Sequence, residues 1–282
     1  MGMRGLRFLA LCAAVLASPV QASDGNGLTS LFTADDNRGW EGVGRLNIGR
    51  SGFCTGALIA PRLVLTAAHC LFDPESHAQI NAAEVEFLAG WRNGRASAYR
   101  GVRRALVHPD YVYEGREGTL RVANDLALLE LDQPIRNGSV KPFRIDSKPS
   151  KGEEVSVVSY AYDRHERPAL EELCHVLARQ SGSLILSCSV DFGSSGAPIF
   201  VTVDGEPRIV SVVSAKAEVR NKPVSLGTNL EEPLAELLDL LEKGDGVFAK
   251  TADEDRAEAR TLTLDAPRAL NGGGSGAKFL RP

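Results

Sequence analysis

Short apolar runs, several of them alternating with polar residues, occupy the chain between Trp40 and Ser225. Turn-forming pairs such as Asn93-Gly94 and Asp204-Gly205 interrupt them. Many short strands with frequent turns are typical of an all-β sandwich or barrel. A linker-like stretch at 136–152 divides the pattern into two halves of similar size. Examples of the predicted strands are Gly56–Ala60, Leu63–Thr66, Val85–Leu88, Leu126–Leu131, Val155–Tyr160, Leu184–Val190, Pro198–Val203 and Ile209–Val213.

One amphipathic helix is predicted after the strands, at residues 230–243. Its leucines recur at i, i+4, i+7, i+8 and i+11, which places them on one helical face. Pro233 suits the first turn of such a helix and Gly244 suits its end. We expect the leucine stripe to be a packing face. Its members are Leu230, Leu234, Leu237, Leu238 and Leu241.

The first 22 residues have the layout of a cleavable secretory signal. Arg4 and Arg7 form a basic opening, Phe8–Ala17 is an uninterrupted apolar run, and Val20-Gln21-Ala22 places small residues at a cleavage site. The apolar run is too short to cross a hydrocarbon core roughly 30 Å thick. The alternative is a buried N-terminal helix. We therefore expect an exported protein, periplasmic or secreted, that has no membrane contact once the signal is removed.

These patterns divide the chain into four segments. We predict a signal at 1–22, an N-terminal extension at 23–39, a folded domain at 40–243 and a disordered tail at 244–282. Within the folded domain, two β units span about 40–140 and 150–228, and the helix follows. The tail is polar and contains the glycine-rich run 271–276, a composition typical of flexible linkers.

Composition narrows the classes of partner. The 282 residues carry 32 Lys+Arg and 36 Asp+Glu, a formal net charge of −4. This mildly acidic balance gives no electrostatic reason to expect nucleic acid or an anionic membrane as a partner. The hydrophobic fraction of 43% excludes a wholly disordered chain.

Five cysteines are present, an odd number whose meaning depends on the compartment. Cys12 leaves with the predicted signal, and the remaining four would face an oxidising compartment, where disulfides form. Four cysteines allow three pairings. The short separations make Cys54–Cys70 with Cys174–Cys188 the simplest of them.

Three motifs carry candidate chemistry. Thr66–Cys70 (TAAHC) follows a predicted strand and presents His69; Asp125 leads into an apolar strand; and Gly193–Pro198 (GSSGAP) exposes Ser195 between glycines. Read alone, each has an ordinary explanation: a core or surface histidine, a turn aspartate, a Gly-Ser loop. Together they supply what a serine nucleophile needs, which is a base to accept its proton and an acid to orient that base.

These segments resemble the histidine, aspartate and nucleophile loops of trypsin/chymotrypsin-like serine proteases. Cys54–Ile59 with Leu65–Cys70 resembles the histidine loop and its attached disulfide, and His108–Tyr111 resembles the stretch ahead of the aspartate. The order His, Asp, Ser fits this family and differs from that of subtilisins and α/β-hydrolases. The resemblance covers about residues 40–243.

The resemblance implies an all-β fold of two antiparallel six-stranded β-barrels with the active site between them. His69 and Asp125 would come from the first barrel and Ser195 from the second. Ser195 would attack the scissile carbonyl, His69 would transfer the proton, and Asp125 would orient His69. Backbone N–H groups of Gly193 and Ser195 would form the oxyanion hole. No metal or cofactor is expected.

The chain departs from the digestive and clotting members at Ser194. In those enzymes an Asp precedes the nucleophile and pairs with a new N-terminus after zymogen cleavage. The loop here is more similar to the bacterial branch, which includes glutamyl-endopeptidase-like enzymes, as is the spacing of Cys174 and Cys188. We expect the oxyanion hole to form without proteolytic activation.

Specificity residues follow from the same resemblance. Ser189 occupies the position at the base of the primary pocket, where trypsin-like cleavage needs a carboxylate, and Asp191 lies nearby in sequence. Ser214, Ala215 and Lys216 resemble the pocket wall that pairs with the substrate backbone. Lys216 stands where glycine often leaves the pocket open, so the pocket is expected to be narrowed or receptive to an acidic side chain.

The sequence thus predicts an exported serine endopeptidase, monomeric, that acts on protein or peptide substrates. Two alternatives remain open. A protease fold can serve as a binding module with little catalysis, and the same triad can hydrolyse esters.

Overall fold

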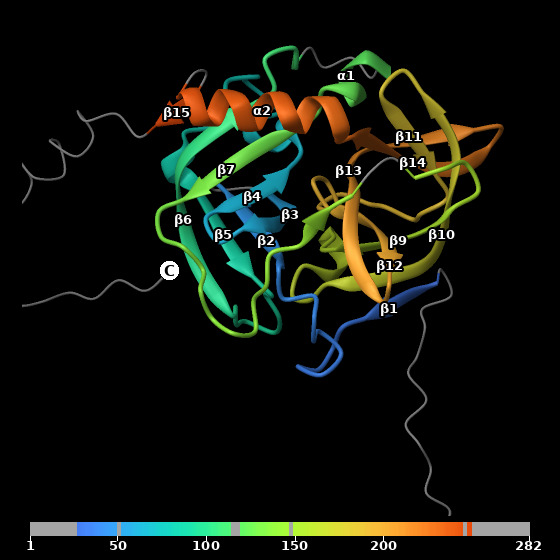
Figure 1. Cartoon of the computed structure of the whole chain (residues 1–282), viewed down its shortest axis with the longest axis horizontal. Helices are drawn as coiled ribbons and strands as arrows, with labels where there is room; N and C mark the ends of the chain where they lie inside the picture. Colours follow the sequence, from blue (N-terminus) through green and yellow to red (C-terminus); the bar gives the residue numbers. More distant parts are fainter. Residues whose placement is uncertain (1–26, 50–51, 114–118, 147–148, 245–246, 250–282) are drawn as a thin grey trace, which may run out of the picture.

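The computed structural model describes residues 27–49, 52–113, 119–146, 149–244 and 247–249 (Figure 1). The predicted signal at 1–22, with Cys12, lies outside the described residues, as does most of the predicted tail.

Six antiparallel strands close the first barrel. The strand order is β6-β5-β2-β3-β4-β7, and β7 pairs back with β6. The short strand β15 extends the sheet by pairing antiparallel with Arg104–Leu106 of β6. The bounds are β2 Val43–Ile48, β3 Gly52–Ala60, β4 Leu63–Thr66, β5 Val85–Ala89, β6 Ala98–Val107, β7 Ala127–Leu131 and β15 Val247–Ala249.

Six further strands close the second barrel. The order is β10-β11-β14-β13-β12-β9, and β9 pairs back with β10. Two short strands are added at its margins: β1 pairs antiparallel with β10, and β8 pairs parallel with β13. The bounds are β1 Leu28–Ser30, β8 Arg144–Ile145, β9 Glu154–Ser159, β10 Ala169–Gln180, β11 Ser183–Leu186, β12 Pro198–Val203, β13 Glu206–Val219 and β14 Lys222–Asn229.

The prediction of two six-stranded antiparallel barrels is confirmed, with three short additions. β1 lies within the segment predicted as an extension, β8 within the linker, and β15 within the segment predicted as a tail. Each has only two or three residues, so its strand conformation comes from hydrogen bonds to a neighbouring strand rather than from a periodic pattern of its own.

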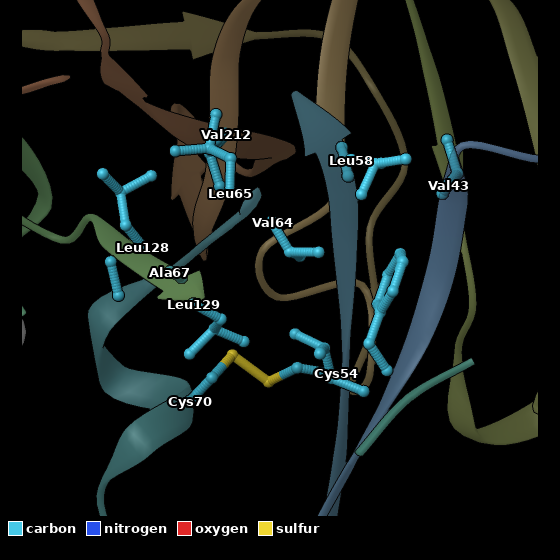
Figure 2. Close-up of a cluster of buried hydrophobic side chains, with 14 of the residues drawn as sticks. Val43, Cys54, Leu58, Val64, Leu65, Ala67, Cys70, Leu128, Leu129 and Val212 are labelled. Carbon is cyan, nitrogen blue, oxygen red and sulfur yellow. A yellow bond between two sulfur atoms is a disulfide. The ribbon is translucent and has the colours of Figure 1, made fainter. Parts of the chain in front are cut away.

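The larger hydrophobic cluster joins the two barrels. It contains most of the buried residues of the first barrel, and it also contains Phe200 and Val212 of the second. Figure 2 shows Val212 beside Leu65 of the first barrel. Trp40, Phe143 and Phe200 form an aromatic group in which the Phe143 and Phe200 rings are 4.8 Å apart. Since Phe143 belongs to the connection between the barrels, this group fixes the linker to both. A second cluster lies within the second barrel alone.

The predicted C-terminal helix is confirmed as α2, Glu231–Lys243. Leu234 and Leu237 of its stripe are buried in the larger cluster, so α2 covers the first barrel although the preceding strand belongs to the second (Figure 1). Gly244 ends the helix with a positive φ of 78°. Within the described residues no helix is long and apolar enough to cross a membrane. The other helices are η1 Ala68–Leu71, η2 Ala82–Glu84, α1 Thr119–Ala123 and η3 Tyr162–Arg164.

The simplest cysteine pairing is confirmed. Cys54 on β3 is bonded to Cys70 on η1, and Cys174 on β10 is bonded to Cys188 after β11. One disulfide therefore braces the loop that carries His69, and the other lies seven residues ahead of Ser195.

Replacement of both Cys174 and Cys188 by Ala should lower the free energy of unfolding by about 3 kcal/mol, because the crosslink limits the unfolded chain. Urea unfolding of the variant and of the disulfide-bonded parent measures this difference. A reducing agent should then destabilise the parent more than the variant, which retains one disulfide. A loss below about 1 kcal/mol would contradict the expected loop-closure contribution.

Candidate active site

His69 is presented by η1, directly after β4. Ala67 and Ala68, which precede it, are completely buried, and their small side chains let the chain pack closely against the core. The disulfide of Cys70 to Cys54 fixes the following residue to β3 (Figure 2). The His69 side chain is 20% exposed. The imidazole is thus held at the margin of the core with one side open to solvent.

Asp125 lies between α1 and β7, with only 1% of its side chain exposed. Its Oδ1 accepts a hydrogen bond from the His69 backbone N–H (2.8 Å), and its Oδ2 lies 2.7 Å from His69 Nδ1. Ser214 of β13 donates its hydroxyl to the same Oδ2. Donors from both barrels therefore satisfy a carboxylate that would otherwise be costly to bury.

These donors decide the charge of Asp125. Burial raises the pKa of its carboxyl, but the charge on His69 and the hydrogen bonds from His69 and Ser214 outweigh burial, so the pKa lies below its ordinary value. An ionised carboxylate can only accept, which assigns the ring proton of a neutral His69 to Nδ1. Nε2 then carries a free lone pair, as a general base requires.

The loop that carries Ser195 packs against β3 and β4 at distances that only glycine permits. Gly196 has a φ of 77°, and a Cβ there would lie 2.1 Å from Thr66 Oγ1 and 2.3 Å from the Thr55 carbonyl oxygen. The Ser195 carbonyl accepts a hydrogen bond from the Thr55 N–H (2.8 Å). Because Thr66 is three residues from His69, this approach brings Ser195 to the strand end that presents the imidazole.

Two backbone N–H groups of this loop are left free. The Phe192 carbonyl accepts from the Tyr162 N–H (2.8 Å), and the Ser194 carbonyl accepts from the Ala197 N–H (2.9 Å). In a trans peptide the N–H points opposite to the carbonyl, so the N–H groups of Gly193 and Ser195 face away from those partners. Neither N–H has a hydrogen-bond partner among the described residues. Such a pair is able to bind an oxyanion.

The expected pocket residues have different surroundings. Ser189 is exposed, and its N–H donates to Glu171 Oε2 (2.8 Å). Ala215 is half-buried, and Lys216 is exposed with its Nζ 3.7 Å from Asp191 Oδ1. The Ser214 hydroxyl is used on Asp125. Lys216 and Asp191 therefore link β13 to the start of the nucleophile loop, where their charges face solvent.

Sequence reasoning missed Thr55. Its hydroxyl donates to the Gly193 carbonyl (2.9 Å) and accepts from the Tyr160 N–H (3.1 Å), which ties the nucleophile loop to both barrels. A threonine inside an apolar strand has no sequence signal that separates this role from ordinary packing.

One group of potential metal ligands occurs within the described residues: Cys54, His69 and Cys70. Both sulfurs are joined in a disulfide, so the group offers no thiolate and only the imidazole could bind a metal ion.

Comparisons with known proteins agree on one family. The sequence model of the trypsin family matches residues 33–183. Serine protease filzig of Drosophila melanogaster is 39% identical over 84 residues, covering 29% of this chain and 4% of that protein. Granzyme M of Rattus norvegicus is 33% identical over 101 residues, covering 36% of this chain and 35% of that protein. Serine protease 23 of Mus musculus is 27% identical over 172 residues, covering 55% of this chain and 44% of that protein.

The chain thus spans less than half the length of each of these relatives. A solved structure of a Glu endopeptidase in complex with MPD has the same fold, with a TM-score of 0.64 and 19% identity. The match covers 79% of this chain and all of that one.

The lowered pKa of Asp125 predicts a pH-dependent contribution to stability. Ionised Asp125 stabilises the folded state above the unfolded-state pKa of about 3.9, and this stabilisation is lost as the pH falls through the lower folded-state value. Asp125→Asn should therefore be most destabilising at neutral pH and less so in acid. Urea unfolding of variant and parent at several pH values tests this, with Asp132→Asn at an exposed position as the control. A difference that stays constant with pH would contradict it.

Proposed function

Because this chain belongs to the trypsin family, we propose that it is an exported serine endopeptidase that hydrolyses peptide bonds through Ser195, His69 and Asp125. The observation that carries the proposal is the buried Asp125–His69 pair, whose geometry leaves His69 Nε2 free as a base. The two disulfides support export, since such bonds persist in oxidising compartments.

In the first chemical step, Ser195 Oγ attacks the carbonyl carbon of the scissile bond while His69 Nε2 takes the hydroxyl proton. Asp125 stabilises the imidazolium that forms and keeps Nδ1 directed toward its carboxylate. His69 then returns the proton to the leaving amine, the C–N bond breaks, and an acyl-enzyme remains. Water attacks the acyl-enzyme by the same proton transfers and releases the new carboxyl group.

The free N–H groups of Gly193 and Ser195 are proposed to bind the negatively charged oxygen of each tetrahedral intermediate. Because their carbonyl partners fix both peptide groups, the donors need no reorganisation during the reaction. Removing one such donor typically lowers turnover about 10²–10³-fold. The pre-arranged donors are therefore expected to account for a large part of the rate enhancement.

Lys216 is proposed to influence the residue accepted on the acyl side of the scissile bond. It occupies the expected pocket wall beside Ala215, and its ammonium group is exposed and separated from Asp191 by 3.7 Å. An acidic substrate side chain could compete with Asp191 for this ammonium group. Protein or peptide substrates with an acidic residue at this position should therefore be favoured.

Ser195→Ala should abolish hydrolysis, with a loss in kcat of about 10⁶-fold, because no nucleophile remains. A fluorophosphonate probe and a peptide library, applied to the folded full chain, measure labelling and cleavage. Ser139→Ala, an exposed serine in the linker region, is the matched control and should label and cleave like the parent. Equal labelling of parent and Ser195→Ala would refute the proposed nucleophile.

Lys216→Ala should reduce the preference for acidic side chains at the cleavage site. The ratio of kcat/KM for a Glu substrate to that for its Gln counterpart should fall about 2- to 5-fold, a range suited to one partly exposed ion pair. Paired peptides that differ only at this residue measure the ratio. An unchanged ratio would exclude Lys216 as a determinant of specificity.

A further inference from the structure

An arginine is largely buried behind the nucleophile loop. Arg164 ends η3, and only 14% of its side chain is exposed. Its Nη2 donates to Ser159 Oγ (3.0 Å) and to Ser194 Oγ (3.4 Å), and its Nη1 donates to Asp163 Oδ1 (3.2 Å). Ser194 is completely buried and immediately precedes Ser195. A cation thus contacts the residue next to the proposed nucleophile.

The Ser194 hydroxyl is the point at which several contacts meet. Besides the Arg164 guanidinium, its oxygen is 3.2 Å from the Tyr160 carbonyl oxygen and 3.3 Å from Ser159 Oγ, and it accepts from the Asp191 N–H at 3.4 Å. One hydroxyl proton can serve only one acceptor at a time. Because Arg164 Nη2 donates to both hydroxyl oxygens, it orients Ser159 and Ser194 together.

The same short helix holds the loop at a second point. Tyr162, two residues before Arg164, donates its backbone N–H to the Phe192 carbonyl (2.8 Å). The peptide groups that contain the free N–H of Gly193 and of Ser195 thus follow Phe192 and Ser194, which are the two residues that η3 contacts. A shift of η3 would turn both donors.

Three acidic side chains, of which only Glu171 is buried, compensate the charge of Arg164. Burial lowers its pKa, while Asp163, Asp191 and Glu171 act in the opposite direction. Glu171 on β10 is 7% exposed, and burial raises the pKa of its carboxyl, whereas the Ser189 N–H and the charge of Arg164 lower it. A guanidinium remains charged in such surroundings. Arg164 therefore stays positively charged behind the Ser195 loop, with its charge balanced by these carboxylates.

We propose that Arg164 is a positioning residue that holds the Phe192–Ser195 backbone in its oxyanion-binding conformation, so that the site needs no new N-terminus for competence. This inference rests on the proposed function of Ser195. Ser194 stands where the family has an aspartate, and its neutral hydroxyl accepts a hydrogen bond from the Arg164 guanidinium. The contact is therefore present in the uncut chain.

The test compares Arg164→Ala with Arg167→Ala. Arg167 lies three residues further along and donates to Asn93 instead of the nucleophile loop. Because oxyanion contacts form in the transition state, Arg164→Ala should lower kcat about 10²-fold with little change in KM. Arg167→Ala should have the kcat and KM of the parent. Melting temperatures identify any loss that comes from unfolding alone.

Two further variants distinguish positioning from general stability. Arg164→Lys should recover activity only in part, because an ammonium cannot reproduce the fork of donors. Added guanidinium ion, at concentrations below those that unfold the protein, should raise kcat of Arg164→Ala about tenfold and leave Arg167→Ala unchanged, as expected for an oriented donor. Absence of this rescue, with Arg164→Ala folded, would overturn the proposal.

A double-mutant cycle covers the case in which Arg164→Ala does not fold. Ser194→Ala removes the hydroxyl that Arg164 contacts, and its kcat should fall about tenfold, with non-additive losses when it is combined with Arg164→Lys. Parental kcat in Ser194→Ala, or additive losses, would overturn the proposal. Fluorophosphonate labelling of the parent at Ser195 separates the two failures, since an unlabelled parent refutes the proposed function itself.

Discussion

A carboxylate with 1% exposure needs donors, and the donors of Asp125 come from both barrels. His69 supplies a backbone N–H and a ring nitrogen from the first barrel, and Ser214 supplies a hydroxyl from the second. Burial without these bonds would be unfavourable by several kcal/mol. The barrels must therefore meet in the one arrangement that satisfies this charge, and the same arrangement orients the imidazole.

Close backbone contact supports that arrangement. Gly196 approaches Thr55 and Thr66 at distances that exclude a side chain, and the Thr55 hydroxyl joins Gly193 to Tyr160. The loop that carries Ser195 is thus built against the first barrel although its flanking strands belong to the second. The position and conformation of Ser195 therefore depend on the interface more than on either barrel alone.

Sequence was sufficient for features with a local signal. Turn residues and apolar runs located eight of the twelve barrel strands, and β2, β6, β10 and β14 lay outside the runs that were named. The leucine stripe located α2, and the spacing of Cys54 and Cys70 suggested their bond. The closed barrels followed from the resemblance to a family. Arg164 and Glu171 were not foreseen, because charged side chains are usually exposed and only the tertiary structure decides which are buried. Ser214 was expected in the pocket wall, but its hydroxyl donates to Asp125 from a point where the register of β13 with β14 shifts, and no sequence pattern marks such a shift.

The ends of the folded unit cross between its halves. β1, near the N-terminus, belongs to the second barrel, whereas α2 and β15, which follow that barrel in sequence, cover the first (Figure 1). Each half is thus completed by chain from the other end of the sequence. Neither barrel is a self-contained module that could be exchanged or inherited alone, and a cut in the linker would leave two fragments that regain their structure only by folding together.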